Sequence, residues 1–247
     1  MILLPPEHAD IDTPTGTMRV HVLRPDVPHA LPGVVMFSEI YQVTGPIHRT
    51  AALLAGQGYV VALPEIYHEY EDPGVAYNYD APGTERGNTL KTTKSVDAYD
   101  ADARATLDFL KQHAACNGKL GTLGICIGGH LAFRCAMNPD VSAGACYYAT
   151  DIHARSLGAG KNDDSLDRMA DIPGEMLMVF GRQDPHVPVE GRRTIYDAMT
   201  AADVNFTWHE FNGQHAFMRD EGHRYDPAIA HQVYGLTYDL FARRLKA

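Results

Sequence analysis

The sequence lacks the long apolar runs, the surplus of basic residues and the basic leader that mark several classes of protein. No segment reaches about 18 uninterrupted apolar residues, so we expect no membrane-spanning helix. The chain carries 21 Lys and Arg against 31 Asp and Glu, a net charge of −10, which disfavours nucleic acid as a partner. The first residues have no basic stretch and only a short apolar run, unlike a signal peptide, so we expect a cytoplasmic protein.

Cysteine is scarce, and no repeat, low-complexity tract or linker rich in Ser and Gly interrupts the chain. The four cysteines are Cys116, Cys126, Cys135 and Cys146, and their spacing matches no zinc or redox motif. In a reducing compartment we expect them to be free thiols. Nothing divides the sequence, so we predict a single domain over residues 1–247.

What the sequence does contain is a regular alternation of apolar strands and helices. This alternation predicts an α/β fold with a mainly parallel sheet and helices on both faces. The predicted strands are 33–37, 59–63, 119–125, 141–148, 174–180 and 205–211, with an early strand pair around 18–23. The predicted helices are 47–58, 97–113, 128–137, 189–202 and 227–245. Residues 65–96 are rich in Pro and Gly and predict a long loop, which is typical of functional lids.

The most informative stretch is Gly124-Ile125-Cys126-Ile127-Gly128-Gly129, between a predicted strand and a predicted helix. It fits a nucleophile elbow, a turn so sharp that small residues must flank the central one. The Cys126 thiol would stand at a helix start, where free N–H groups favour a thiolate. The amide of Ile127 would then point at a developing oxyanion. The alternative is a buried cysteine with a purely structural role.

An attacking thiol needs a base, and that base needs an acid to orient it. Asp184 follows the predicted strand that ends at 180, and His215 follows the one that ends at 211. Side chains after the carboxyl ends of parallel strands meet at one edge of a sheet, where such folds bind ligands. The order nucleophile, acid, histidine is that of the α/β-hydrolase fold.

A second acidic residue, Glu39, comes directly after the first apolar strand. In this fold the loop at that point supplies the second amide of the oxyanion hole. Glu39 would share a pocket with Cys126 and help control the protonation of the thiol. The alternative for Glu39 is a solvated acid on a loop.

At these residues the chain resembles the dienelactone hydrolase family, the carboxymethylenebutenolidase-like α/β-hydrolases, from about residue 18 to 245. The resemblance rests on five motifs besides the general pattern of strands and helices. They are Glu39-Ile40, Gly58-Tyr59-Val60 with Pro64, Gly124-Ile125-Cys126-Ile127-Gly128-Gly129, Gly181 with Asp184-Pro185, and His215-Ala216-Phe217.

The resemblance implies a Cys-His-Asp triad formed by Cys126, His215 and Asp184. It also implies a resting thiol that is neutral and that loses its proton to Glu39 once the substrate is bound. Ile40 and Ile127 would provide the oxyanion amides. Arg219, four residues after the histidine, would bind a substrate carboxylate, and Arg86 is a rough match to a second carboxylate-binding arginine.

We therefore predict a hydrolase that opens lactones or cleaves esters through a thioester acyl-enzyme, without metal or cofactor. Its partner would be a small-molecule substrate, and the protein would be a monomer or a weak homodimer. Alternatives are a carboxylesterase or thioesterase of broader specificity and a non-catalytic binding protein on the same fold. A Cys amidotransferase or protease-like hydrolase is disfavoured, because it usually has an acid where Phe217 stands. A zinc site formed by His48, Glu65, His68 and Glu69 lacks a ligand spacing pattern.

Overall fold

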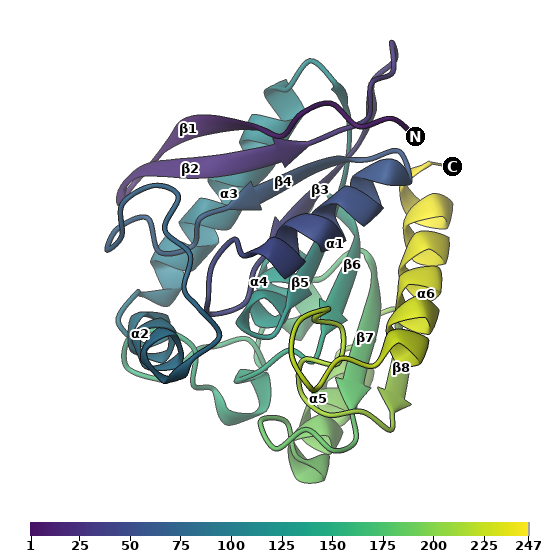
Figure 1. The fold of residues 1–247 in the computed structure, drawn as a ribbon. Coiled ribbons are helices and arrows are strands. Elements are labelled where there is room, and N and C mark those ends of the chain that lie inside the picture. The colour runs from purple at the N-terminus through teal and green to yellow at the C-terminus, as the bar shows by residue number, and fades with distance from the viewer. Residues whose placement is uncertain (247) are drawn as a thin grey trace.

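The computed structural model describes residues 1–246, and all eight strands join one sheet in the order β1-β2-β4-β3-β5-β6-β7-β8 (Figure 1). Strands β3 to β8 pair in parallel, and β2 runs antiparallel to both of its neighbours. The strands are β1 (Glu7–Thr13), β2 (Gly16–Leu23), β3 (Leu31–Phe37), β4 (Val60–Pro64), β5 (Cys116–Ile125), β6 (Val141–Tyr147), β7 (Glu175–Gly181) and β8 (Phe206–Phe211).

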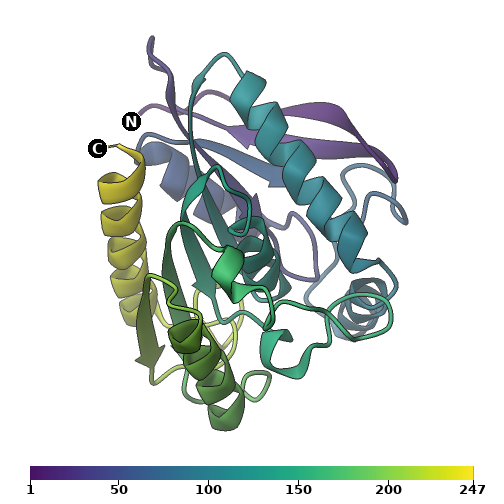
Figure 2. The ribbon, with the colours of Figure 1, turned by 180° about the vertical axis from the view of Figure 1, so that it is seen from behind.

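Helices cover both faces of this sheet. Figure 1 shows α1 (Gly45–Gly56) and α6 (Pro227–Leu245) in front of it, and Figure 2 shows α3 (Val96–Gln112) and α5 (Val189–Ala201) behind. Helix α4 (Ile127–Cys135) packs on the same face as α3. Two short 3-10 helices, η1 (Ile152–Ala154) and η2 (Met169–Asp171), lie in the connection from β6 to β7. The predicted parallel sheet with helices on both faces is confirmed.

The hydrophobic core consists of two clusters, one on each side of the sheet. Val34 and Val35, neighbours on β3, belong to different clusters because successive side chains of a strand point to opposite faces. Both are fully buried, which explains why the central strands read as continuous apolar runs. Within residues 1–246, no helix combines the length and the apolar character that crossing a bilayer requires.

The prediction of a continuous loop over 65–96 is wrong, because helix α2 (Ala81–Lys91) forms within it. Two glycines and a proline made this segment look irregular, yet Pro82 occupies the first turn, where its missing N–H costs nothing. The Asp80 side chain caps the helix by accepting a hydrogen bond from the Gly83 amide at 2.8 Å. Gly87 allows the helix backbone to pack directly on Ile40, whose Cβ would lie 2.9 Å from an added Cβ.

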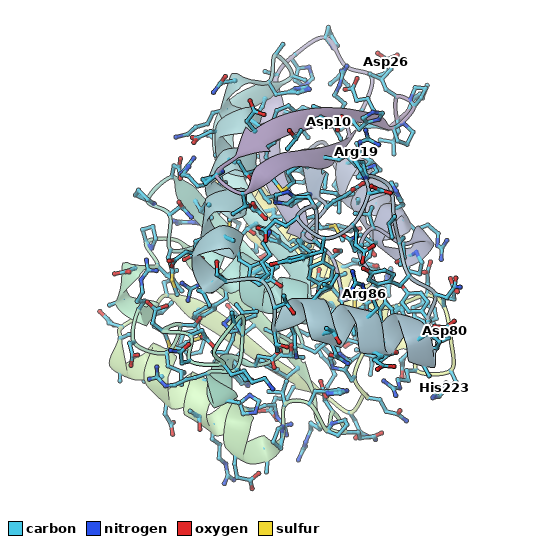
Figure 3. All side chains as sticks on the ribbon, turned by 90° about the vertical axis from the view of Figure 1, so that its left-hand side faces the viewer. Asp10, Arg19, Asp26, Asp80, Arg86 and His223 are labelled. Carbon is cyan, nitrogen blue, oxygen red and sulfur yellow. The ribbon has the colours of Figure 1, made fainter. Side chains whose placement is uncertain are left out.

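The early strand pair also differs from the prediction around 18–23. The pair is a hairpin of β1 and β2, and β1 lies wholly before the predicted residues. Because β1 is an exposed edge strand that alternates polar and half-buried residues, it shows little apolar signal. Figure 3 labels one cross-strand pair of this hairpin, in which the Arg19 Nε donates to the Asp10 Oδ1 at 2.8 Å.

Candidate active site

The predicted site residues follow the carboxyl ends of four parallel strands. Glu39 comes after β3, Cys126 after β5, Asp184 after β7 and His215 after β8. The parallel register aligns the ends of β3 and β5, of β5, β6 and β7, and of β7 and β8, so these ends share one edge of the sheet. A cavity of about 540 Å³ opens there. Its lining includes Glu39, Ile40, Cys126, His215 and Arg219.

Cys126 stands on a backbone turn that few residues can adopt. Its φ is 62° and its ψ is −121°, a strained combination for a residue with a side chain. A Cβ on Gly124 would overlap the carbonyl oxygen of Gly128, and a Cβ on Gly128 would overlap that of Phe37. Only glycine fits at both positions, so the glycines of the motif are required by the close approach of three segments. The turn holds the cysteine at the start of α4 and on the cavity wall.

Two backbone amides, those of Ile40 and Ile127, lack an acceptor within residues 1–246. Ile127 is the first residue of α4, and Ile40 lies in the loop after β3. Unpaired N–H groups at a helix start and in a cavity-lining loop suit the stabilisation of an oxyanion.

His215 is held between an acid and the sulfur. The Asp184 Oδ2 lies 2.7 Å from the His215 Nδ1, so this nitrogen donates to the carboxylate. The Cys126 side chain interacts with the same ring and lines the same cavity. The backbone N–H of His186 donates to the other oxygen of Asp184 at 2.8 Å. Both Asp184 and His215 are buried. The rings of His186 and Tyr148 pack edge-on against His215.

The electrostatics of this pair favour a charged ring. Burial by itself lowers the pKa of His215, but the interactions with the Cys126 sulfur and with Asp184 outweigh it and raise the pKa to about 10. A proton on the ring is therefore favoured at neutral pH.

Glu39 is buried in the wall of the same cavity, where it interacts with Tyr79 and Arg219. The Tyr79 hydroxyl donates to the Glu39 Oε2 at 3.1 Å, and the Arg219 Nη1 lies 4.0 Å from the Oε1. Burial raises the pKa of Glu39, and Arg219, His215 and the Tyr79 hydrogen bond offset part of the rise. Only 2% of Glu39 is exposed, so the solvated loop acid weighed as the alternative does not describe it.

The expectation that Arg86 joins this site is not met. Its Nε donates to the Glu71 Oε1 at 2.6 Å, the side chain is exposed, and it is absent from the cavity lining within residues 1–246. Figure 3 labels Arg86 on α2. Lys91 of the same helix lines the cavity instead, with its Nζ 3.0 Å from the Asp151 Oδ1. Five residues of helix turn a side chain by roughly 140°, so Arg86 and Lys91 point to different sides.

Several cavity residues give no signal in the sequence. Tyr79 and Lys91 belong to the segment read as a loop, and Asp151 lies in the connection after β6. No motif or periodicity in those stretches distinguishes them from ordinary polar residues. Of the four residues considered for a zinc site, His48, Glu65, His68 and Glu69, the Glu65 carboxylate is hydrogen-bonded to His21. Within residues 1–246, no group of three His, Cys, Asp or Glu side chains is arranged to hold a metal ion.

Comparison with known proteins identifies the family of the chain. A sequence model described as the dienelactone hydrolase family matches residues 18–245. A protein of Saccharomyces cerevisiae, named as a presumed carboxymethylenebutenolidase, is 42% identical over 96% of this chain and 91% of its own length. The carboxymethylenebutenolidase of Pseudomonas putida is 27% identical over 81% of this chain and 80% of its own.

The fold has close structural counterparts as well. The crystal structure of a presumed dienelactone hydrolase from Klebsiella pneumoniae superposes with a TM-score of 0.86. The superposition covers 98% of this chain and 100% of that one at 22% identity, a likeness that concerns the fold.

Proposed function

Because the chain belongs to the dienelactone hydrolase family and is a carboxylic ester hydrolase with the α/β-hydrolase fold, we propose that Cys126, His215 and Asp184 are its catalytic triad. The observation that carries the proposal is the His215 ring, which is hydrogen-bonded to Asp184 and lines the same cavity as Cys126, with which it interacts. We propose that the whole chain acts as one domain, since its eight strands join one sheet. The predicted cytoplasmic location and the monomeric or weakly dimeric state stay predictions.

In the proposed acylation step, the Cys126 sulfur attacks the carbonyl carbon of a bound lactone or ester. The carbonyl oxygen becomes negative and is stabilised by the N–H groups of Ile40 and Ile127. The bond from that carbon to the ester or ring oxygen then breaks, and His215 gives its proton to the leaving oxygen. The acyl group remains on the sulfur as a thioester.

In the proposed deacylation step, water attacks the thioester carbon while His215 takes a proton from it. Asp184 keeps the ring in the tautomer that leaves the nitrogen near the sulfur free to accept that proton. The carbon–sulfur bond breaks, the acid is released, and the sulfur returns as a thiolate beside a protonated His215.

For the substrate, we propose a carboxylate-bearing lactone or ester whose acid group binds Arg219. This guanidinium lines the cavity and matches a carboxylate with two parallel donors. At 4.0 Å from Glu39 it makes no hydrogen bond to that residue, so a substrate carboxylate can compete for it. Glu39, with its pKa raised by burial, would then act as a base that controls the protonation of the thiol.

The triad is tested by Cys126→Ala, with Cys116→Ala as the matched control on a half-buried cysteine outside the cavity. We expect Cys126→Ala to abolish hydrolysis of enol-lactones and aryl esters, and Cys116→Ala to keep full rates. Mass spectrometry of acid-quenched wild type should find the acyl group on Cys126. Full activity of Cys126→Ala, or no acyl adduct in an active enzyme, would refute the mechanism.

The substrate class is tested by Arg219→Ala with two esters that differ only in a free carboxylate. We expect kcat/KM to fall at least about tenfold more for the acid than for the neutral ester, since a charged hydrogen bond is lost. Equal losses on both esters would favour the carboxylesterase or thioesterase of broader specificity.

A further inference from the structure

One side chain, Tyr79, contacts both Glu39 and Arg219, two polar residues that line the cavity together with Cys126. Its hydroxyl donates to the Glu39 Oε2 at 3.1 Å, and the Arg219 guanidinium carbon lies 4.1 Å from the centre of its ring. The ring also packs edge-on against Tyr41, with centroids 4.7 Å apart. Tyr79 immediately precedes Asp80, the residue that caps α2, and lines the cavity itself.

This hydroxyl is the principal restraint on the Glu39 carboxylate. Within residues 1–246, the only hydrogen bond to that carboxylate comes from Tyr79, because Arg219 stands at 4.0 Å. A buried carboxylate with one hydrogen bond is only partly satisfied, so its orientation depends strongly on that bond. Loss of the hydroxyl would leave Glu39 without a hydrogen-bonding partner in a buried place.

Thr44 also belongs to this set of hydrogen bonds, because its hydroxyl contacts that of Tyr79. The Thr44 Oγ1 lies 2.6 Å from the Tyr79 hydroxyl oxygen. A tyrosine hydroxyl has a single proton, and here it goes to Glu39, so Thr44 must donate to Tyr79. Thr44 therefore orients Tyr79, and Tyr79 orients Glu39. The three residues come from the loop after β3 and from the segment before α2, which are distant in sequence.

We propose that Tyr79 is a positioning residue that holds Glu39 toward Arg219 and fixes the plane of the Arg219 guanidinium for a substrate carboxylate. The inference rests on the proposed function, in which Glu39 controls the thiol and Arg219 binds the acid group. It adds that the segment leading into α2 sets the orientation of both groups. The chemical class recognised is an ester or lactone with a carboxylate that docks beside a tyrosine ring.

The pH dependence offers a readout that a merely structural residue would not change. Glu39 interacts with the charges or hydroxyl groups of Arg219, His215, Tyr79 and Tyr148. Among these, the Tyr79 hydrogen bond lowers the pKa of Glu39, since it stabilises the ionised carboxylate. Removal of the hydroxyl therefore raises that pKa further and moves the limb of the rate profile that depends on Glu39 to higher pH.

The experiment compares Tyr79→Phe, Tyr79→Leu and Thr44→Val with Tyr77→Phe as the matched control. Tyr77 lies two residues away, outside the cavity, and its hydroxyl also donates to a carboxylate, that of Glu71 at 2.7 Å. Steady-state kinetics from pH 5 to 9 would use a carboxylate-bearing enol-lactone and its neutral methyl ester. Thermal unfolding of every variant would verify that it is folded.

We expect Tyr79→Phe to lower kcat about tenfold or more, with KM changed less than about twofold, because a hydrogen bond to a charged group is lost while the ring remains. Tyr79→Leu should in addition raise KM for the acid substrate and not for the neutral ester, because the ring under Arg219 is gone. Thr44→Val should resemble a weaker Tyr79→Phe. Tyr77→Phe should keep the kinetics and pH profile of the wild type.

A Glu39→Gln variant separates failure of this inference from failure of the proposed function. If Glu39→Gln lowers kcat while Tyr79→Phe keeps the rate and pH profile of the wild type, the role of Tyr79 is refuted and the function stands. If Glu39→Gln turns over at the normal rate, the role of Glu39 in the proposed function falls. If Tyr77→Phe changes kinetics as Tyr79→Phe does, Tyr79 merely stabilises the segment, and the positioning role is refuted.

Discussion

Gly87 of helix α2 packs its backbone directly on Ile40, a residue that lines the cavity together with Cys126. A side chain at Gly87 would overlap the Ile40 carbonyl oxygen and come within 2.9 Å of its Cβ. The Tyr67 hydroxyl donates to the Gly87 carbonyl oxygen at 3.1 Å and fixes the helix at the same point. The position of a proposed oxyanion amide thus depends on a helix that lies off the sheet (Figure 1).

Gly87→Ala should lower both stability and activity, although alanine normally favours a helix over glycine. The overlap forces α2 or the Ile40 loop to move, at a cost of about 1–3 kcal/mol in unfolding free energy. We expect kcat to fall at least about tenfold, because small displacements of a catalytic group are costly. The control is Gly235→Ala in α6, where an added Cβ meets nothing within 4 Å. It should gain about 0.5–1 kcal/mol, and a gain at Gly87 of the same size would contradict the packing argument.

The proton of His215 should be bound less tightly once the sulfur is removed. The ring has a pKa of about 10 in the fold, and Cys126 contributes to that rise. In Cys126→Ala the raising effect of the sulfur is lost, while burial still lowers the pKa of His215. An NMR titration of the His215 ring should therefore find a lower pKa than in the wild type. Cys116→Ala, which leaves the cavity intact, should leave the titration unchanged. An identical titration in Cys126→Ala and wild type would show that the sulfur and the ring do not interact.

The same shift predicts a pH dependence of stability. The folded pKa of His215 lies above its ordinary value of 6.5, so the folded state binds this proton more tightly. Its contribution is complete below pH 6.5 and is lost as the pH rises through about 10. Urea denaturation should therefore show the wild type losing more unfolding free energy over this range than Cys126→Ala. Parallel losses in the two proteins would count against the linkage.

Glu39→Gln should impair turnover but increase the free energy of unfolding relative to the wild type, and this gain should grow as the pH rises. Burial raises the pKa of Glu39 above its ordinary value of 4.5, so its ionisation opposes folding, and this cost is absent below pH 4.5. The difference in unfolding free energy between Glu39→Gln and wild type should be more favourable at pH 8 than at pH 4.5. Glu85→Gln, an exposed change on α2, should show no such trend. A constant difference across pH would mean that Glu39 ionises without penalty.

Lys94, in the connection from α2 to α3, forms a buried ionic cluster with Asp102 and Glu69. Removal of a single charge from this cluster should lower the free energy of unfolding. Lys94 is fully buried, with its Nζ 2.6 Å from the Asp102 Oδ2 and 3.0 Å from the Glu69 Oε1. Asp102→Asn removes the closer countercharge and should cost about 3–5 kcal/mol. The double variant Lys94→Met with Asp102→Asn should recover part of this loss, as urea denaturation can measure. A double variant that is no more stable than the single one would contradict the charge argument.

The sequence allowed the outline of the fold, and the placement of Cys126, Asp184 and His215 at one edge of the sheet, to be predicted for a definite physical reason. Buried parallel strands need continuous apolar runs, and residues after their carboxyl ends share one edge of the sheet, so the placement of Cys126, Asp184 and His215 follows from the pattern. Gly124 and Gly128 indicated a sharp turn at Cys126, because that turn excludes every larger residue at both positions. The C-terminal helix, predicted over 227–245, has those bounds in the structure.

Other features could be decided only by tertiary structure. Helix α2 is rich in glycine, and its stability comes from packing on Ile40 rather than from its own propensity. The rotation of that helix turns Lys91 toward the cavity and Arg86 away from it. The hydrogen bond from Tyr79 to Glu39 joins residues forty positions apart. Local patterns specify which residues form a strand or a tight turn, whereas contacts between distant irregular segments depend on how the folded chain packs them together.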